Sequence, residues 1–254
     1  MALIPRLRRK RKEASMTLIE HLEELRSRLI VSFLAIGVGA IAGWFLFDPT
    51  VRLLREPYCD VVGQLPKPPI AGCDLVFFGA IDAVVLKLKV VAFIGLFIAL
   101  PVVLYQLWAF IVPGLTDRER KLAIPFVASS VLLFAFGAVM AYYTLPRGLG
   151  FLLNFAGEPV RALLGAKEFI GFVMLMALAF GVSFEFPLLL IFLAAVWIVS
   201  SQTLRRWRRM MIVGLALVAA VITPSQDPYT MFAMLIPMVA LYEGAILVTR
   251  LMKK

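Results

Sequence analysis

The stretch FIGFVMLMALAFGVSFEFPLLLIFLAAVWIV, from Phe169 to Val199, decides the fold class of this chain. It carries a single charged side chain, Glu185. About 20 consecutive apolar residues cross the hydrocarbon core of a bilayer as a helix, so this stretch predicts a transmembrane helix. Five further apolar runs occur at Leu29–Phe47, Val84–Val112, Leu122–Leu145, Met210–Thr223 and Tyr229–Thr249. The sequence therefore predicts an all-α integral membrane protein with six transmembrane helices.

The composition favours the same class. Hydrophobic residues make up 62% of the chain and charged residues 17%, and a soluble domain of this composition would expose large apolar patches. A polar segment separates the basic stretch Pro5–Lys12 from the first apolar run, and that run has the length of a span, so no cleavable signal peptide is predicted. The net charge of +10 gathers at the ends of the apolar runs. That distribution is typical of contact with anionic lipids and indicates no nucleic-acid binding.

Lys and Arg also predict the orientation. Most of the 26 flank one side of the expected membrane, in the N-terminal tail, two connections and the C-terminus, whereas Lys87 and Lys89 lie within the second run. The opposite side has six: Arg52, Arg55, Lys67, Arg147, Arg161 and Lys167. Because basic residues are retained in the cytoplasm, we expect both termini there. The expected parts are a basic tail (1–16), a membrane domain (17–249) and a second tail (250–254).

The last two predicted helices differ from the others in length. The fifth, Met210–Thr223, has about 14 residues and reaches only about 21 Å, against about 30 Å of hydrocarbon. Pro237 interrupts the sixth, and proline punctuates several other runs. Because proline bends a helix, we expect a cupped bundle whose short fifth and sixth helices leave a depression beside them.

The loop between the first two spans contains Cys59 and Cys73, on the side where disulfides persist. A disulfide and two free thiols in an apolar cap both fit this position. Asp227, between the fifth and sixth runs, is expected to cap a helix in a turn. No nucleotide-binding loop, metal-ligand cluster or nucleophile–base set is found in the sequence. We therefore expect no enzyme, no cofactor and no metal.

Two glutamates flank apolar runs on the expected cytoplasmic side. Glu24 lies in an amphipathic segment, Thr17–Leu29, that we expect as an interfacial helix leading into the first span. Glu119 opens the third run in a charged turn. Both could instead be structural, Glu24 as an i,i+4 partner of Arg28 and Glu119 as a favourable charge at a helix N-terminus.

Glu185 is the sharper candidate because it lies near the middle of a span. A charge at that depth costs about 2.5–3.5 kcal/mol unless it is neutral, paired or facing water. Glu243 is similar but lies nearer the end of the sixth run. A functional contact and a structural interhelical hydrogen bond are the two alternatives for Glu185.

Together these residues resemble the TatC family, the C subunits of twin-arginine protein translocases. The resemblance is collinear over nearly the whole chain. Its segments are His21–Leu29, Pro57, Tyr105–Pro113 with Leu115 and Glu119, Phe180–Pro187, Thr223–Pro224 with Asp227, and Ile236–Pro237 leading to Glu243.

The resemblance implies a receptor for signal peptides that carry two consecutive arginines, in a pathway that exports folded proteins. Glu24 and Glu119 would accept those arginines on the cytoplasmic face, and Phe110, Leu115 and Arg26 would shape the neighbouring surface. Glu185 and Glu243 would be polar intramembrane contacts for the single-span subunits TatA and TatB. Pro57 and Asp227 would belong to the outer cap.

The resemblance also implies a multi-pass protein of the cytoplasmic membrane that contacts lipids, associates with itself and draws on the proton-motive force. Two other functions remain open on the residues alone. A proton-coupled transporter would use Glu185 as its proton carrier and usually contain an internal repeat, which the sequence lacks. A structural scaffold would tolerate Ala at Glu24 and Glu119.

Overall fold

The computed structural model describes residues 18–63, 73–111, 123–155, 164–195, 199–225 and 227–251. Within these ranges the regular structure is helical, apart from an isolated parallel bridge between Val76 and Gly165, and short turns and irregular segments connect the helices. The helices are α1 (Leu18–Phe45), α2 (Phe47–Val62), α3 (Asp82–Ile111), α4 (Ala123–Phe155), α5 (Ala166–Ala195), α6 (Ser201–Arg206), α7 (Arg208–Ile222) and α8 (Pro228–Leu251).

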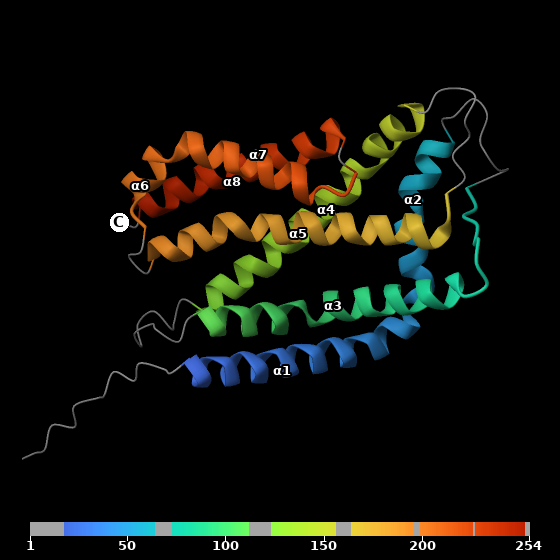
Figure 1. Cartoon of the computed structure of the whole chain (residues 1–254), viewed down its shortest axis with the longest axis horizontal. Helices are drawn as coiled ribbons and strands as arrows, with labels where there is room; N and C mark the ends of the chain where they lie inside the picture. The colour runs from blue at the N-terminus through green and yellow to red at the C-terminus, as the bar shows by residue number, and fades with distance from the viewer. Residues whose placement is uncertain are drawn as a thin grey trace, which may run out of the picture.

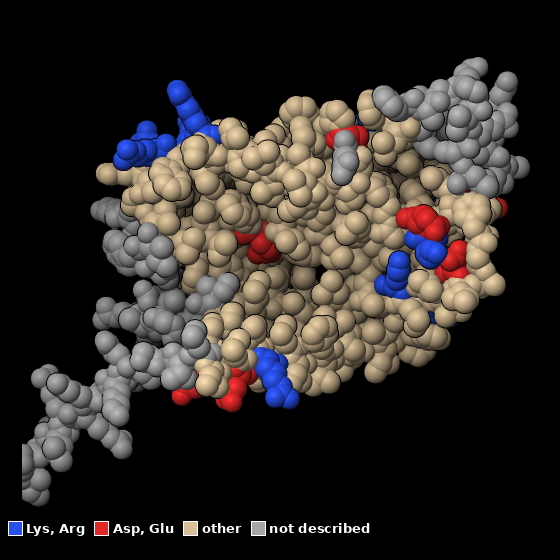
Figure 2. Space-filling model, in the orientation of Figure 1, with Lys and Arg blue, Asp and Glu red and all other residues tan. Residues whose placement is uncertain are grey.

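Five of these helices are long and apolar enough to cross a membrane: α1, α3, α4, α5 and α8. An apolar run becomes a helix in lipid because only a helix satisfies every backbone N–H and C=O within the segment. Figure 2 shows charged side chains gathered toward the ends of the body, with little charge between them on the visible face. The chain is therefore a multi-pass membrane protein.

The elements form a layered arrangement around α5. Figure 1 shows α1 and α3 side by side along one edge, α7 and α8 along the opposite edge, and α4 crossing α5 obliquely. Most of the α5 span is buried within the molecule, whereas most of the α1 span is exposed. The main apolar core gathers residues of α5, α8, α4 and α2, including the fully buried Phe180, Phe184, Met234 and Tyr242.

Glycine allows α1 and α3 to approach closely. A Cβ on Gly39 would lie 2.6 Å from the carbonyl oxygen of Gly95, and a Cβ on Gly95 would lie 2.7 Å from the carbonyl oxygen of Ile36. On the next turn of α1, a Cβ on Gly43 would lie 2.8 Å from the carbonyl oxygen of Val91. Small residues four apart are typical of tightly packed membrane helices. This packing holds the second half of α1 against the first half of α3.

The helix α2 lies where the sequence predicted an outer loop. Leu54, Tyr58, Val61 and Val62 are buried at the i, i+4, i+7 and i+8 positions of one face. That spacing belongs to an amphipathic helix packed on a core. Pro57 lies inside this helix, buried on the same side, and is not a loop residue.

Three other helices also differ from the prediction in length or continuity. α4 continues ten residues beyond Leu145 with Pro146 inside it, and α1 begins at Leu18 without a break between an interfacial segment and the span. α8 runs through Pro237 without interruption, and its 24 residues are enough for a span. Membrane helices tolerate proline because neighbouring groups satisfy the freed carbonyl. α7 is short as predicted, with 15 residues or about 22 Å.

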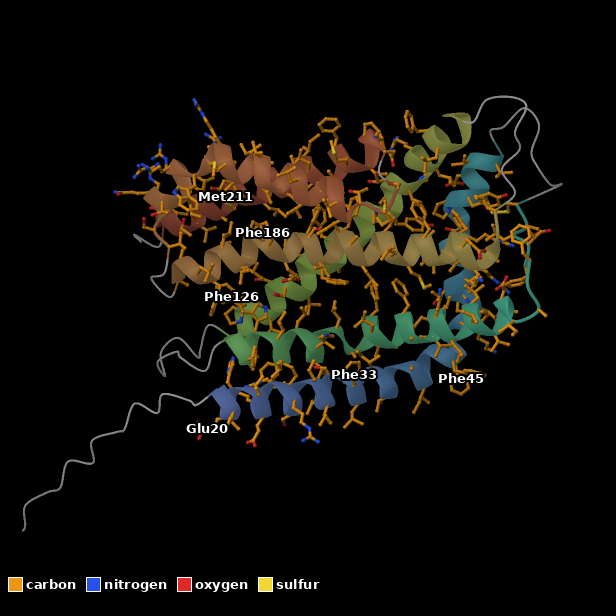
Figure 3. All side chains as sticks on the ribbon, viewed as in Figure 1. Glu20, Phe33, Phe45, Phe126, Phe186 and Met211 are labelled. Atoms are coloured by element: carbon orange, nitrogen blue, oxygen red, sulfur yellow. A yellow bond between two sulfur atoms is a disulfide. The ribbon has the colours of Figure 1, made fainter. Side chains whose placement is uncertain are left out.

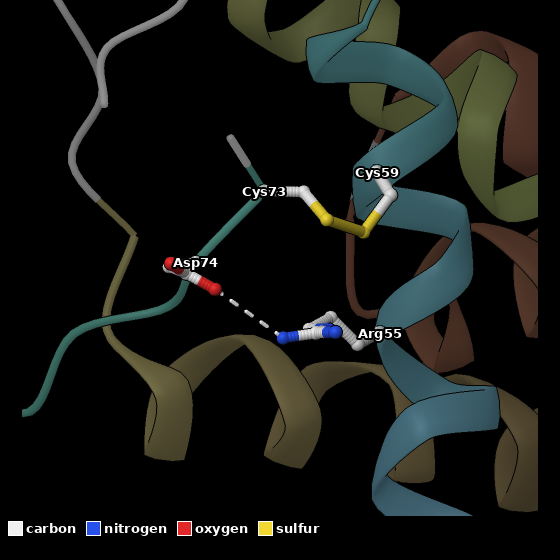
Figure 4. The surroundings of a disulfide bond; sticks show 4 residues. All are labelled: Arg55, Cys59, Cys73 and Asp74. Atoms are coloured by element: carbon white, nitrogen blue, oxygen red, sulfur yellow. Dashed lines mark hydrogen bonds and ion pairs between the residues drawn. A yellow bond between two sulfur atoms is a disulfide. The ribbon is translucent and has the colours of Figure 1, made fainter. Parts of the chain in front are cut away.

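One end of the molecule is tied together by several links. A disulfide joins Cys59 of α2 to Cys73, whose Cα atoms are 4.9 Å apart, and Arg55 pairs with Asp74 at 3.5 Å (Figure 4). Lys167 of α5 lies 2.5 Å from Asp82 of α3. The starts of α3 and α5 and the body of α2 are thereby held in one cap.

A half-open apolar cavity of about 620 Å³ lies between α2, α3, α4 and α5. Its walls include Leu54, Phe93, Phe97, Val139 and Met176. The sequence predicted a depression beside the short fifth and sixth helices, but this cavity lies on the other side of α5. Figure 1 shows α4 diverging from α3 toward the cap, and residues of both helices line this cavity.

Candidate functional site

The first candidate site lies where α1 begins and α3 ends. On α1, the Arg28 guanidinium donates from Nε to Oε1 of Glu24 at 3.0 Å. The same guanidinium donates from Nη1 to Oε1 of Gln106 on α3 at 3.2 Å. The side chains of Glu24 and Arg28 are only 21% and 22% exposed. Arg28 thus connects Glu24 to the neighbouring helix, a contact the sequence did not predict.

One oxygen of the Glu24 carboxylate is available for a further hydrogen bond. Its Oε2 is buried and has no hydrogen-bond partner among the described residues. A carboxylate has about four lone-pair sites and can accept from two guanidinium groups. A buried acceptor without a partner costs about 1–3 kcal/mol. This oxygen is therefore suited to a further donor from outside the chain.

An apolar groove adjoins Glu24. It has a volume of about 250 Å³, runs between α1 and α3, and is lined by residues that include Leu25, Arg28, Phe33, Gln106 and Phe110. The Phe110 ring stacks on His21 of α1, with centroids 4.5 Å apart. The structure thus places Phe110 against the helix that carries Glu24.

The other residues expected here have different placements. Arg26 is exposed and is not among the residues that line the groove, because positions two apart on a helix face different ways. Glu119 and Leu115 lie outside the described residues. Figure 3 shows Glu20, in the first turn of α1, and Phe126, near the start of α4, at the same end of the molecule.

The second candidate site surrounds Glu185, in the central helix α5. The Ser130 hydroxyl of α4 lies near the Glu185 carboxyl group. Ser130 itself accepts a hydrogen bond of 2.6 Å from Nε1 of Trp108 on α3. Oε1 of Glu185 is buried with no partner among the described residues. Side chains of α3 and α4 are thus bonded to each other near this intramembrane carboxyl group of α5. No feature of the sequence indicated Ser130.

Glu243 is already paired within the chain. Arg208 Nε, at the start of α7, donates to its Oε1 at 2.5 Å, and the two side chains are 57% and 33% exposed. This pair ties α7 to α8. Glu243 therefore differs from Glu185, which forms no ion pair with the described residues.

Asp227 is the N-cap that the sequence predicted. Its Oδ1 accepts from the backbone N–H of Thr230 at 2.8 Å, and its Oδ2 accepts from the Thr230 hydroxyl at 2.5 Å. Burial raises the pKa of Asp227, but hydrogen bonds from Ser225 and Thr230 outweigh it and hold the pKa below its usual range. Gly148 of α4 gives this cap room, because a Cβ there would lie 2.5 Å from Thr230 Cγ2.

The described part of the chain holds no group of three or more His, Cys, Asp or Glu side chains that could bind a metal ion. Its two candidate sites instead present carboxyl oxygens with unused hydrogen-bonding capacity. One site lies where α1 begins and α3 ends, beside an apolar groove, and the other lies inside the membrane. Such sites can bind donors, guanidinium at the first and neutral polar groups at the second.

Known proteins share this sequence and fold. The family model of the Sec-independent protein translocase protein (TatC) matches residues 20–237. The TatC of Frankia casuarinae is 43% identical over 241 residues, which are 93% of this chain and 66% of that protein. The TatC of Xylanimonas cellulosilytica is 38% identical over 94% of this chain and 84% of its own length.

A solved structure agrees with the sequence comparisons. The crystal structure of the twin arginine translocase receptor TatC in DDM is 33% identical, with a TM-score of 0.73 over 90% of this chain and 98% of that one. The arrangement of the helices is therefore shared. The chain belongs to the TatC family of Sec-independent protein translocase proteins.

Proposed function

We propose that this chain is the receptor subunit of a twin-arginine export system, and that Glu24 binds an arginine of the signal peptide. The observation that carries the proposal is the buried, unpartnered Oε2 of Glu24 beside the groove between α1 and α3. The proposed location is the cytoplasmic membrane, with both termini in the cytoplasm. Glu24 would then face the compartment in which precursor proteins are made.

The chemistry of Glu24 favours arginine over lysine. The contact from Arg28 shows that this carboxylate accepts a guanidinium in the orientation it has here. An arriving guanidinium would bond Oε2 while Arg28 keeps Oε1. Arginine offers five donors in a planar fork, whereas a lysine ammonium is a compact, strongly hydrated charge. Glu24 should therefore bind a signal peptide with two arginines more tightly than a peptide with two lysines.

The groove suits the apolar part of a signal peptide. Leu25, Phe33 and Phe110 give it an apolar wall next to the acidic group, so a peptide with basic residues followed by apolar ones would match both. Glu119 and Leu115, assigned by their position in the family motif, would add a second carboxylate and a further apolar contact. Arg26 would act at the rim, since its side chain is exposed.

Assembly with other subunits is assigned to the intramembrane site. We propose that Glu185 contacts TatA and TatB, because an uncharged polar group of a neighbouring span can satisfy its remaining oxygen. Glu243 is assigned a secondary role in assembly, because its ion pair with Arg208 would have to break before it could contact another subunit. Transport work is assigned to the proton-motive force, and several copies would associate in the receptor complex.

Binding of a fluorescent twin-arginine signal peptide to the purified protein in nanodiscs tests the receptor proposal. Glu24→Gln keeps the shape of the side chain and removes its charge, and we expect a loss of about ten- to a hundredfold in affinity, equivalent to a charged hydrogen bond of about 1.5–3 kcal/mol. Glu23→Gln is the matched control, because Glu23 is the exposed neighbour on the same helix. A twin-lysine peptide should bind wild type weakly.

The contrary result is equally clear. If Glu24→Gln and wild type bind the twin-arginine peptide equally, and neither prefers it over the twin-lysine peptide, Glu24 is only a structural partner of Arg28. The same comparison with Glu119→Gln decides the role of the second carboxylate independently.

A further inference from the structure

The apolar cavity between α2, α3, α4 and α5 opens at the surface of the molecule. Ile98 of α3 and Val139 of α4 line it, and both side chains are exposed. Each lies near the middle of a helix long enough to cross a membrane. The opening is therefore at the depth of the hydrocarbon core, where an occupant has to be apolar.

The cavity has the depth of one leaflet. Its wall on α4 extends from Ala135 to Leu145, which is about 15 Å and half of the roughly 30 Å of hydrocarbon. The helix α2 is attached near one end of this wall, because the Tyr142 hydroxyl lies 3.2 Å from the carbonyl oxygen of Leu53 and 2.8 Å from Oε2 of Glu56. The cavity thus runs from the middle of the spans to α2.

The size of the cavity favours a lipid chain over a helix. An α-helix with its side chains is about 10–12 Å across, so each turn occupies about 400–600 Å³. The cavity of about 620 Å³ therefore holds little more than one turn, whereas a span needs about five or six turns. An acyl chain is far thinner than a helix and enters from the surrounding bilayer without leaving an apolar environment.

Lys87 places a positive charge next to the end of the cavity at α2. It lies on α3, five residues or about 7.5 Å beyond Asp82. Its Nζ is 4.2 Å from the ring centroid of Trp44 and 5.4 Å from that of Phe47, and it forms no ion pair with the described residues. Phe47 lies one turn before Thr50, which lines the cavity, so the two side chains share one face of α2.

The surroundings of Lys87 suit the headgroup region of a lipid. Trp44 is exposed near the end of α1, and exposed tryptophan at the end of a span is typical of the membrane interface. A lysine ammonium has three donors and binds phosphate as a point charge. A charge inside an apolar helix is costly unless it is paired or reaches the interface. A lipid phosphate would supply the anion that Lys87 lacks among the described residues.

We propose that the cavity binds one acyl chain of an anionic phospholipid, from the leaflet on the side of α2, with the phosphate of that lipid at Lys87. The bound chain would fill the space between α3 and α4 and support α2 from below. This site goes beyond the proposed receptor function and does not depend on it, because neither Glu24 nor the groove between α1 and α3 takes part.

Native mass spectrometry tests the choice of headgroup. The protein is released from nanodiscs with equal amounts of phosphatidylglycerol and phosphatidylcholine that carry the same acyl chains. We expect wild type to retain one phosphatidylglycerol with a preference of about fivefold, the effect of one basic residue on an anionic lipid. Lys87→Gln should lose this preference and Lys87→Arg should keep it.

Lys89→Gln is the matched control, because Lys89 is exposed two positions along the same helix and faces another way. It should keep the preference for phosphatidylglycerol. Equal retention of the two lipids by wild type would overturn the proposal. So would an equal loss of preference in Lys87→Gln and Lys89→Gln, since the lipid would then respond to charge in general.

Filling the cavity tests the place of the acyl chain. Ala138 lines the cavity on α4 and is half-buried, so Ala138→Phe should abolish retention of the lipid. Ala128→Phe, at an exposed position of α4 outside the cavity, should not. Unfolding temperatures of both variants check the fold, and if Ala138→Phe unfolds, the Lys87 variants still decide. Full lipid retention by a folded Ala138→Phe would overturn the proposal, and a concurrent loss of co-purified single-span subunits would assign the cavity to a protein helix.

Discussion

A single carboxylate, Asp227, begins helix α8. The cap bond to the Thr230 N–H satisfies one of the backbone donors that every helix start leaves open. The pKa of Asp227 is held below its usual range, so the ionised form stabilises the folded protein. This contribution is fully present at neutral pH and is lost as the pH falls through the lowered pKa.

We predict that Asp227→Ala lowers the stability of the protein at neutral pH by about 1 kcal/mol, the usual cost of losing an N-cap. Asp227→Asn should keep most of the stability at neutral pH, since asparagine also caps well, but it should remove part of the acid-induced loss below about pH 4. Thermal unfolding in detergent across pH measures both. Asp74→Asn, at an exposed ion pair, is the control, and equal acid sensitivity in wild type and Asp227→Asn would contradict the prediction.

At the scale of single residues, the sequence pointed to the candidate carboxylates more clearly than to the residues of the same chain that lie next to them. Glu24, Glu185 and Asp227 stand out in the sequence because an acidic side chain beside or inside an apolar run suggests a structural or functional role. Ser130 does not stand out, since serine is common in membrane helices. Its contact with Trp108 depends on how α3 and α4 are rotated about their axes, which a hydropathy pattern leaves open.

At the scale of helices, the pair α1–α3 determines the geometry of the first site. Gly95→Val would place side-chain atoms where the backbone of Ala40 and the carbonyl of Ile36 now lie. We expect the two helices to separate, at a cost of about 1–3 kcal/mol for overpacking. The hydrogen bond from Arg28 to Gln106 should be lost, and affinity for the signal peptide should fall with it.

Gly37→Val is the matched control, because a Cβ at Gly37 meets no atom within 4 Å. Unfolding temperature and peptide affinity are measured for both variants. If Gly95→Val behaves like Gly37→Val in both measurements, the close packing of α1 on α3 does not support the groove.

The sequence predicted the long membrane helices and missed α2, which lies in a polar segment. The spans follow from apolar runs because lipid demands helices of a minimum length. α2 contains Asp48, Arg52 and Asp60 and so resembles a loop by average hydropathy. Its helical signal is in the periodicity of Leu54, Tyr58 and Val61, which becomes clear once the buried face is known. Average hydropathy identifies the membrane-spanning helices. The periodicity of apolar residues identifies an amphipathic helix, such as α2, that packs against the ends of those spans.

At the scale of the whole molecule, the distribution of charge predicts its orientation. The disulfide between Cys59 and Cys73 and the α2 cap would lie outside the cell, where such bonds persist. The basic residues of α6 and of the start of α7 would lie in the cytoplasm. The two ends of α5 thus face opposite compartments in this account.

Cysteine labelling tests the orientation in intact cells. In a Cys59→Ser/Cys73→Ser background, Asp74→Cys should react with a membrane-impermeant maleimide from outside, since Asp74 is exposed. Gln202→Cys, exposed on α6, should react only after the membrane is opened. The reverse pattern would show that the protein has the opposite orientation in the membrane. Glu24 would then lie outside, where it could not receive precursors made in the cytoplasm.

The central claim, that the end of the α1–α3 pair receives the arginine pair, is tested most directly by photo-crosslinking. A twin-arginine peptide with a photoreactive group next to its arginines is bound to the protein in membranes, and the adducts are mapped by mass spectrometry. We predict adducts within 18–33 of α1 and 103–110 of α3, competed by unlabelled twin-arginine peptide and not by the twin-lysine form. Adducts on α7 and α8, or adducts that both peptides compete equally, would contradict the account.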